Sequence, residues 1–214
     1  MGQCSCVYLH GFLSSGNSLK GQWFKQAFAG QKSSSSSSIH CRVLTPTYPM
    51  QDPQESMRFL HQFIKQTGLL NSESKWFLAG SSMGGFYARY LAHYYRVPLL
   101  MINPALDPIA LMSNYYGVHY NPHTREELFI DQIYRDKLAE FYPQTATKPL
   151  DSLLLLDKGD GVIPYQSTLK HYEKDDRQQC QIFEGGDHAF QHLEEAKPKI
   201  ELFLRDTLFK SDQL

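Results

Sequence analysis

Short, continuous runs of apolar residues are the feature that most restricts how this chain can fold. Six of them read as strands: Cys4–Leu9, Cys41–Leu44, Lys75–Ala79, Pro98–Ile102, Ser152–Asp157 and Gln179–Phe183. Because these runs are apolar throughout and do not alternate with polar residues, we expect strands that are covered on both faces. The segments between them predict helices at Ser56–Thr67, Met83–Tyr95, Pro164–Tyr172 and Pro198–Phe209. The alternation predicts an α/β fold with a mainly parallel sheet and helices on both of its faces.

Two segments depart from this alternation. Residues 105–143 are rich in Tyr, Asn and Pro and look partly helical from about 125 to 141, so we expect a small cap insertion over the sheet edge. Residues 30–39 contain six consecutive serines, Ser33–Ser38, and are typical of a flexible surface loop. No linker divides the chain, and its length of 214 residues, 42% of them hydrophobic, suits a single domain spanning 1–214.

The charge balance argues against several classes of partner. There are 21 basic and 22 acidic residues, and the basic ones form no cluster, so we expect neither nucleic-acid binding nor attachment to an anionic membrane. No apolar run reaches the 18 residues that a membrane helix needs. The first residues lack the pattern of a signal peptide, and Cys6 stands where a myristoylation signal needs Ser or Thr. We therefore expect no stable membrane insertion.

The four cysteines, Cys4, Cys6, Cys41 and Cys180, form no CxxC pair and no Cys/His pattern with zinc spacing. We expect no metal and no cofactor. Cysteines in apolar, strand-like runs are typical of buried free thiols in a reducing compartment, which is the interpretation that we adopt for them.

The motif Gly80-Ser81-Ser82-Met83-Gly84 is the strongest chemical signal. It follows one predicted strand and opens the next predicted helix, the context in which a G-x-S-x-G match indicates a nucleophilic serine. Small residues are needed on both sides of Ser82 because the turn there is tight. The turn would raise the Ser82 hydroxyl above the sheet edge, where the backbone N–H of Met83 could stabilise an oxyanion.

A nucleophilic serine needs a base, and the base needs a carboxylate that orients it. Both occur after later strands, in the order Ser, Asp, His: Asp160 in one loop and His188 in the next. Asp157 competes with Asp160 for the role of acid, but Asp157 ends a strand and more naturally shapes the turn. His192 is the reserve candidate for the base.

The loop after the first strand supplies the second oxyanion donor. Gly11 lets the backbone turn so that the N–H of Phe12 can face the Ser82 site. We interpret His10 as a residue that holds this loop by hydrogen bonds. Aromatic residues of the loop, the helix after Ser82 and the cap could line a substrate pocket, or could equally pack the cap onto the sheet: Phe12, Phe86, Tyr115, Tyr116 and Phe129.

These motifs together resemble the YqiA-type bacterial esterases, a compact group of α/β hydrolases. The resemblance runs from residue 8 to residue 190 in family order. It rests on Tyr8-Leu9-His10-Gly11-Phe12, Gly80-Ser81-Ser82-Met83-Gly84-Gly85-Phe86-Tyr87-Ala88, Asn103-Pro104-Ala105, Asn121-Pro122, Gly159-Asp160 and Glu184-Gly185-Gly186-Asp187-His188-Ala189-Phe190. The serine run is outside the family pattern.

The resemblance implies an α/β-hydrolase fold and an esterase with Ser82 as nucleophile, Asp160 as acid and His188 as base. It also implies small ester or acyl-CoA substrates and a cytoplasmic protein. Two other functions use the same scaffold: a ligand-binding module without turnover, which predicts a broken triad, and an acyltransferase with the same triad. The sequence does not define the oligomeric state.

Overall fold

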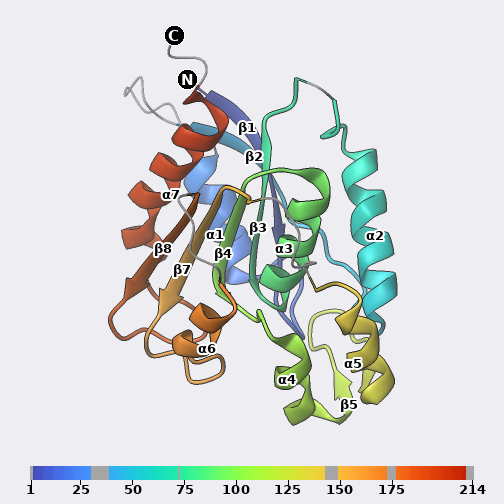
Figure 1. The fold of residues 1–214 in the computed structure, drawn as a ribbon. Coiled ribbons are helices and arrows are strands. Elements are labelled where there is room, and N and C mark those ends of the chain that lie inside the picture. Colours follow the sequence, from blue (N-terminus) through green and yellow to red (C-terminus); the bar gives the residue numbers. More distant parts are fainter. Residues whose placement is uncertain (1, 30–38, 72, 143–148, 173–176, 211–214) are drawn as a thin grey trace.

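The computed structural model describes residues 2–29, 39–71, 73–142, 149–172 and 177–210. Its centre is a parallel sheet of six strands in the order β2-β1-β3-β4-β7-β8, drawn in Figure 1. The strands are β1 (Gly2–Leu9), β2 (Ile39–Leu44), β3 (Trp76–Ser82), β4 (Leu99–Pro104), β7 (Ser152–Asp157) and β8 (Gln178–Phe183). All six predicted strands are therefore present. The predicted serine loop at 30–39 lies outside the described residues, apart from Ile39, which opens β2.

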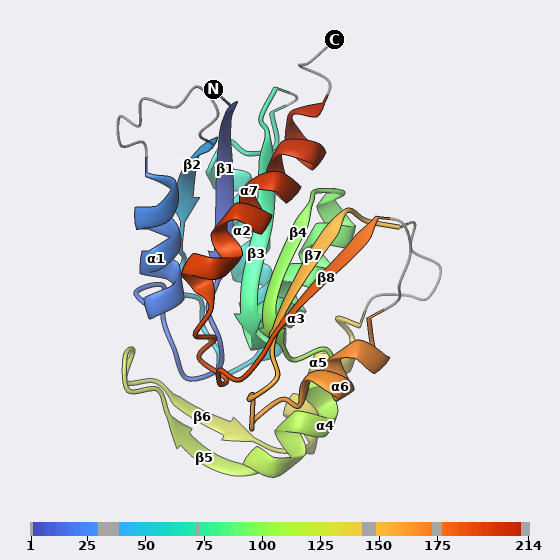
Figure 2. The same ribbon diagram turned by 90° about the vertical axis from the view of Figure 1, so that its left-hand side faces the viewer.

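Helices cover both faces of the sheet, as the continuous apolar strands predict. One face packs on α1 (Leu19–Phe28) and α7 (Leu193–Leu208), where Tyr8, Phe24 and Phe203 are fully buried. The other packs on α2 (Pro53–Gln66) and α3 (Met83–Tyr95), where Leu60, Leu78 and Leu91 are fully buried. Figure 2 shows α7 in front of the strands, α1 beside β2, and α2 and α3 behind the sheet. The sheet is thus the middle of three layers.

The helix α3 has the predicted bounds, whereas α2 and α7 begin earlier than predicted. α2 begins at Pro53 because the Asp52 carboxylate caps it, accepting hydrogen bonds from the N–H groups of Gln54 and Glu55. α7 begins at Leu193, five residues before the predicted Pro198. The acidic side chains of Glu194 and Glu195 lie in its first turn, where they favour a helix start, and Pro198 lies inside the helix.

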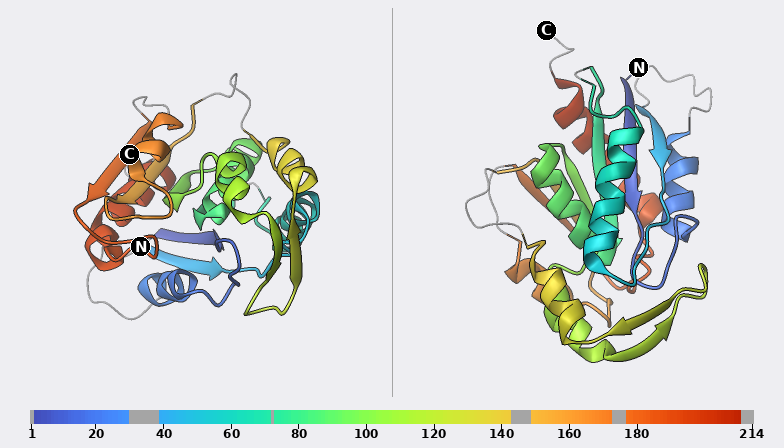
Figure 3. Two further views of the ribbon diagram at one scale, coloured as in Figure 1. Left: turned by 90° about the horizontal axis from the view of Figure 1, so that it is seen from below. Right: turned by 90° about the vertical axis from the view of Figure 1, so that its right-hand side faces the viewer.

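The insertion after β4 is more varied than the predicted, partly helical cap. It contains α4 (Pro108–Met112), a 3-10 turn (Ser113–Tyr115), an antiparallel hairpin of β5 (Gly117–Tyr120) and β6 (Glu127–Ile130), and α5 (Gln132–Ala139). The hairpin and α4 lie below the C-terminal ends of the sheet strands in Figure 2, and Figure 3 shows them from underneath. This is the sheet edge where enzymes of this architecture place their ligands.

The interpretation of all cysteines as free thiols is wrong for two of them. Cys4 and Cys41 lie opposite each other in the paired strands β1 and β2, and they form a disulfide. Their apolar surroundings gave no sign of this, because the pairing depends on the register of two strands that are distant in the chain. Cys6 and Cys180 are free, and burial raises the pKa of the Cys6 thiol.

The described helices include none that combines the length and the apolar character needed to cross a membrane.

Candidate active site

The turn between β3 and α3 holds Ser82 in a strained conformation. Its φ of 52° and ψ of −127° lie outside the regions that residues other than glycine usually adopt. The flanking glycines make the turn possible. A Cβ on Gly84 would lie 2.1 Å from the carbonyl oxygen of Leu9, and one on Gly80 would lie 2.3 Å from that of Gly84. The G-x-S-x-G pattern is therefore explained by close backbone contacts on both sides of Ser82.

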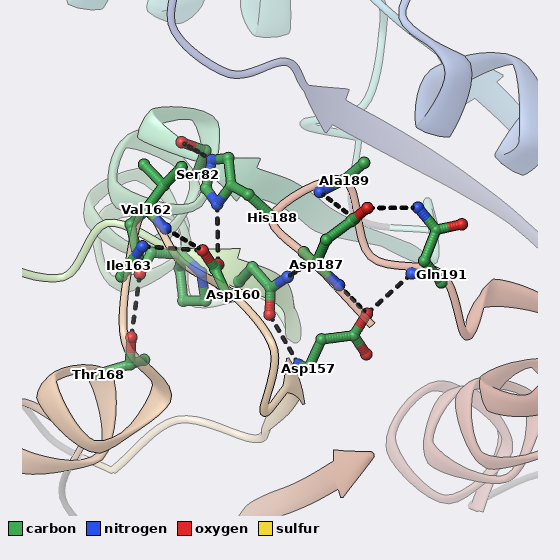
Figure 4. Close-up of polar contacts among 12 residues, drawn as sticks. Ser82, Asp157, Asp160, Val162, Ile163, Thr168, Asp187, His188, Ala189 and Gln191 are labelled. Atoms are coloured by element: carbon green, nitrogen blue, oxygen red, sulfur yellow. Dashed lines mark hydrogen bonds and ion pairs between the residues drawn. The ribbon is translucent and has the colours of Figure 1, made fainter. Parts of the chain in front are cut away.

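His188 lies within hydrogen-bonding distance of this serine. Its loop follows β8, and its Nε2 is 3.1 Å from the Ser82 Oγ, although the two residues are 106 positions apart in the chain (Figure 4). On its other side the His188 Nδ1 is 2.8 Å from the Asp160 Oδ2. Since a carboxylate can only accept, Nδ1 carries the proton and Nε2 is free to accept the serine hydroxyl hydrogen.

Asp160 is held in place by its own loop. Its side chain is fully buried, and its Oδ1 accepts hydrogen bonds from the backbone N–H groups of Val162 at 2.9 Å and Ile163 at 2.8 Å. These two bonds leave Oδ2 directed at His188. The structure thus brings Ser82, His188 and Asp160 into one hydrogen-bonded line, the arrangement that polarises a serine hydroxyl.

The two alternative residues, Asp157 and His192, pair with each other. The His192 Nδ1 is 2.7 Å from the Asp157 Oδ1, and the Asp157 side chain is fully buried. The Asp157 Oδ2 also accepts the N–H groups of Gln191 at 2.8 Å and Asp187 at 3.2 Å. Asp157 therefore binds both ends of the short loop that carries His188.

Asn103 strengthens the same loop, a role that the sequence did not reveal. Its side-chain oxygen accepts the N–H of Asp157 at 2.9 Å, and its amide nitrogen donates to the carbonyl oxygen of Asp187, also at 2.9 Å. Asn103 has a φ of 41° at the end of β4 and is 2% exposed. In the sequence, Asn103-Pro104 is one of the motifs of the family resemblance, and the motif does not indicate which residues Asn103 bonds to.

The loop after β1 lies directly against Ser82. A Cβ on Gly11 would approach the Ser82 Cβ to 3.2 Å, so a larger residue would press on the nucleophile. The cap holds this loop at two points. The Phe12 ring packs edge-on against Tyr115 at 5.7 Å, and the Asn121 side-chain amide donates to the carbonyl oxygen of Ser14 at 2.9 Å. Phe12 and Met83, the two expected oxyanion donors, thus occupy the two segments that flank Ser82.

His10 is buried beneath this loop and has no contact with the Ser82 hydroxyl among those that join the described residues. Its ring stacks on Tyr48 at 4.3 Å, and its Nδ1 donates to the carbonyl oxygen of Gly11 at 3.0 Å. Its Nε2 is buried with no hydrogen-bond partner in the described structure. Burial, with a smaller effect of nearby His123, lowers the pKa of His10 to about 4. The residue is a neutral support of the loop.

This burial predicts an acid-sensitive fold. An unfolded histidine takes up a proton near pH 6.5, whereas folded His10 resists protonation until about pH 4, so its contribution to stability is present above pH 6.5 and is lost as the pH falls. We expect it to remove about 2 kcal/mol of the unfolding free energy between pH 7 and pH 4.5. Urea unfolding at both pH values should show that His10→Asn loses less unfolding free energy on acidification than the wild type does.

A second histidine, His93, allows the same test at another place in the fold. Burial also lowers the pKa of His93 to about 4, and the residue lies near the C-terminal end of α3. His93→Gln should reduce the same acid loss. If His10→Asn loses as much stability on acidification as the wild type, His10 does not cause the effect.

The five aromatic candidates for a substrate pocket do not gather at one place. Phe86 is 1% exposed and its ring contacts are with Tyr87 and Tyr142, within the core. The Tyr116 hydroxyl joins the side chains of Gln132 and Arg135, and Phe129 is 58% exposed. Among the described residues, the only ring contact between two of the five is that of Phe12 with Tyr115.

Comparisons with known proteins agree with this architecture. The model of a family described as "Uncharacterised protein family (UPF0227)" matches residues 5–205. Est1E from Butyrivibrio proteoclasticus superimposes with a TM-score of 0.69 at 14% identity, covering 96% of this chain and 88% of that one. A monoacylglycerol lipase from Paleococcus ferrophilus has a TM-score of 0.69 at 16% identity, with 97% of each chain covered.

A third neighbour is the α/β hydrolase GrgF from Penicillium sp. sh18, with a TM-score of 0.68 at 14% identity, covering 97% of this chain and 91% of that one. At these identities the likeness concerns the fold. The prediction of an α/β-hydrolase fold is confirmed.

Proposed function

Because the chain belongs to the UPF0227 family, the family of the YqiA-type proteins, we propose that it is a serine esterase that hydrolyses small carboxylic esters through an acyl-enzyme. The observation that carries the proposal is the hydrogen-bonded line from the Ser82 Oγ to the His188 Nε2 and from the His188 Nδ1 to the Asp160 Oδ2. The strained Ser82 backbone at the end of β3 supports it, because such strain persists where function requires it.

In this mechanism the Ser82 Oγ attacks the ester carbonyl carbon while His188 Nε2 takes the hydroxyl proton. The carbonyl oxygen becomes an oxyanion, which accepts hydrogen bonds from the N–H groups of Phe12 and Met83. The bond to the alcohol breaks, and His188 returns the proton to the leaving oxygen. A water molecule then attacks the acyl-enzyme by the same route. Asp160 fixes the His188 tautomer and stabilises its positive charge throughout.

The test combines turnover with covalent labelling. We expect the protein to hydrolyse p-nitrophenyl acyl esters within the range of two to sixteen carbons. A fluorophosphonate should label one residue, and peptide mass spectrometry should identify it as Ser82. Labelling of another serine would contradict the proposed nucleophile. A folded protein that neither labels nor hydrolyses any ester would instead be the ligand-binding scaffold.

Acyl-CoA thioesters and a cytoplasmic location belong to the same proposal, and the family resemblance supports both. Release of free CoA from acyl-CoA, measured with a thiol reagent, tests the first. Cell fractionation tests the second. The Cys4–Cys41 disulfide argues against a cytoplasmic location, because structural disulfides are uncommon in the cytosol.

A further inference from the structure

A cavity of about 330 Å³ opens between the cap helix α4 and α6 (Tyr165–Lys170), which follows the Asp160 loop. Figure 2 shows these two helices next to each other below the sheet. The walls of the cavity come from the end of β4, from α4 and from the Asp160 loop. Their apolar members include Ala105, Leu106, Ala110, Leu111, Val162 and Ile163. The volume is at the lower end of the range for small-ligand sites.

Two of these walls form hydrogen bonds with members of the line of Ser82, His188 and Asp160. The N–H of Ala105 donates to the carbonyl oxygen of Ser82 at 3.0 Å. The N–H groups of Val162 and Ile163 are the donors that hold the Asp160 carboxylate, as Figure 4 shows. The residues that make these contacts, Ala105, Val162 and Ile163, are therefore also members of the cavity lining.

The chemistry of the walls favours an aliphatic group. The carboxylate of the lining, that of Asp107, accepts two hydrogen bonds at its Oδ1, from the Tyr142 hydroxyl at 2.7 Å and from the N–H of Ala110 at 3.2 Å. His171 lies 3.8 Å from the same carboxylate. Thr168 is buried, and its hydroxyl donates to the carbonyl oxygen of Pro104 at 3.4 Å. The other polar side chains, Asn114, Ser167 and Lys170, are exposed, as expected for a mouth open to water. A ligand lying against Leu106, Leu111 and Ile163 would meet aliphatic carbon.

We propose that this cavity binds the aliphatic chain of the ester substrate. The inference rests on the proposed esterase function. It adds which part of the protein determines the chain length of the substrates. A cavity of about 330 Å³ is at the lower end of the range for small-ligand sites, so it suits a chain of short to medium length. The substrates are accordingly esters of short to medium chain length.

Ala110 is the position from which the cavity can be filled. It lies in α4, lines the cavity and has a small, exposed side chain, so a large residue can enter without displacing the core. Ala139 in α5 is its matched control, because it is also an exposed alanine of a cap helix but lies outside the cavity lining. The test compares Ala110→Trp with Ala139→Trp.

The substrate panel has two arms, because an aliphatic chain can belong to either half of an ester. One arm compares p-nitrophenyl octanoate with p-nitrophenyl acetate, and the other compares octyl acetate with ethyl acetate by release of acetic acid. In Ala110→Trp the ratio of kcat/KM for the long chain to that for the short chain should fall at least about tenfold, since each buried methylene contributes about fourfold. Ala139→Trp should leave the ratio unchanged.

If the kcat/KM ratio falls only in the first arm, the cavity binds the acyl chain. If the ratio falls only in the second arm, the cavity binds the chain of the alcohol. Unchanged ratios in both arms overturn the proposal. If Ala110→Trp does not fold, Leu111→Ala takes its place: by enlarging the cavity it should move the preferred chain length upward, and an unmoved preference overturns the proposal.

A binding measurement separates this inference from the proposed function. Octanoic acid is titrated calorimetrically into Ser82→Ala and into Ser82→Ala with Ala110→Trp, neither of which needs to turn over. At least tenfold weaker binding by the double variant supports the cavity even if no ester is hydrolysed. Equal binding by both, or no binding by Ser82→Ala, overturns the cavity proposal even if the wild type is an active esterase.

Discussion

Replacing Ser82 with alanine lowers kcat for ester hydrolysis by a factor on the order of a million, the largest effect that we expect from any single substitution. The reason is that in the proposed mechanism the Ser82 Oγ forms the acyl-enzyme, and among the contacts of the described residues it is the hydroxyl that the His188 Nε2 reaches. Initial rates with a p-nitrophenyl ester, measured at protein concentrations high enough to detect residual turnover, give the number.

Ser81→Ala is the matched control, because it removes the hydroxyl of the neighbouring residue. The Ser81 hydroxyl is buried and bonds to the Tyr8 hydroxyl at 2.9 Å, on the opposite side of the sheet from α3. Its loss should lower the unfolding free energy by about 1 kcal/mol and leave kcat within a few fold. Near-normal activity of Ser82→Ala, or an equal fall in Ser81→Ala, would remove Ser82 from the mechanism.

Replacing Asp160 with asparagine lowers kcat by roughly ten thousandfold. Asparagine fits the same space, but its neutral amide cannot stabilise the His188 cation, and it lets the imidazole adopt the wrong tautomer. The bonds from Val162 and Ile163 can still reach the asparagine oxygen, so the fold should survive. Steady-state kinetics and a thermal melt on the same sample test both statements.

Asp157→Asn distinguishes the proposed catalytic role of Asp160 from the role of Asp157, which holds the His188 loop in place. Asp157 accepts hydrogen bonds from His192, Gln191 and Asp187, and none of the contacts among described residues joins it to His188. We expect a loss of about 2 kcal/mol in unfolding free energy and a smaller fall in kcat than for Asp160→Asn. A reversal, with kcat lost in Asp157→Asn and kept in Asp160→Asn, would make Asp157 the acid.

The sequence predicts those parts of the molecule that depend on neighbouring residues. The turn at Ser82 requires glycines two positions away on each side, and a buried parallel strand such as Ser152–Asp157 must be apolar along its length. The order of Ser82, Asp160 and His188 along the chain follows from the order in which parallel strands deliver loops to one edge. Such local requirements leave a pattern that can be read directly.

Other features depend on contacts between distant segments and leave no such pattern. The strands β5 and β6 have four residues each, too few for a clear period, and the region from 125 to 141 therefore reads as a helix although only Gln132–Ala139 forms one. The bond between Cys4 and Cys41 depends on strand register. Phe129 in β6 is exposed and Phe86 in α3 is buried because of how distant segments pack, which no local spacing encodes.

The distance of 106 residues between Ser82 and His188 also has a consequence for biosynthesis. Ser82 and its turn leave the ribosome long before His188, and β8, which delivers His188, pairs only with β7, at one edge of the sheet. A growing chain therefore contains a serine without a base until the sheet has gained its last strand. A premature stop after residue 84 and before residue 188 yields a fragment that has the G-x-S-x-G motif but lacks His188. Contacts of such long range are also the ones that fold slowly, so under the proposed mechanism the Ser82 hydroxyl gains its base only late in folding.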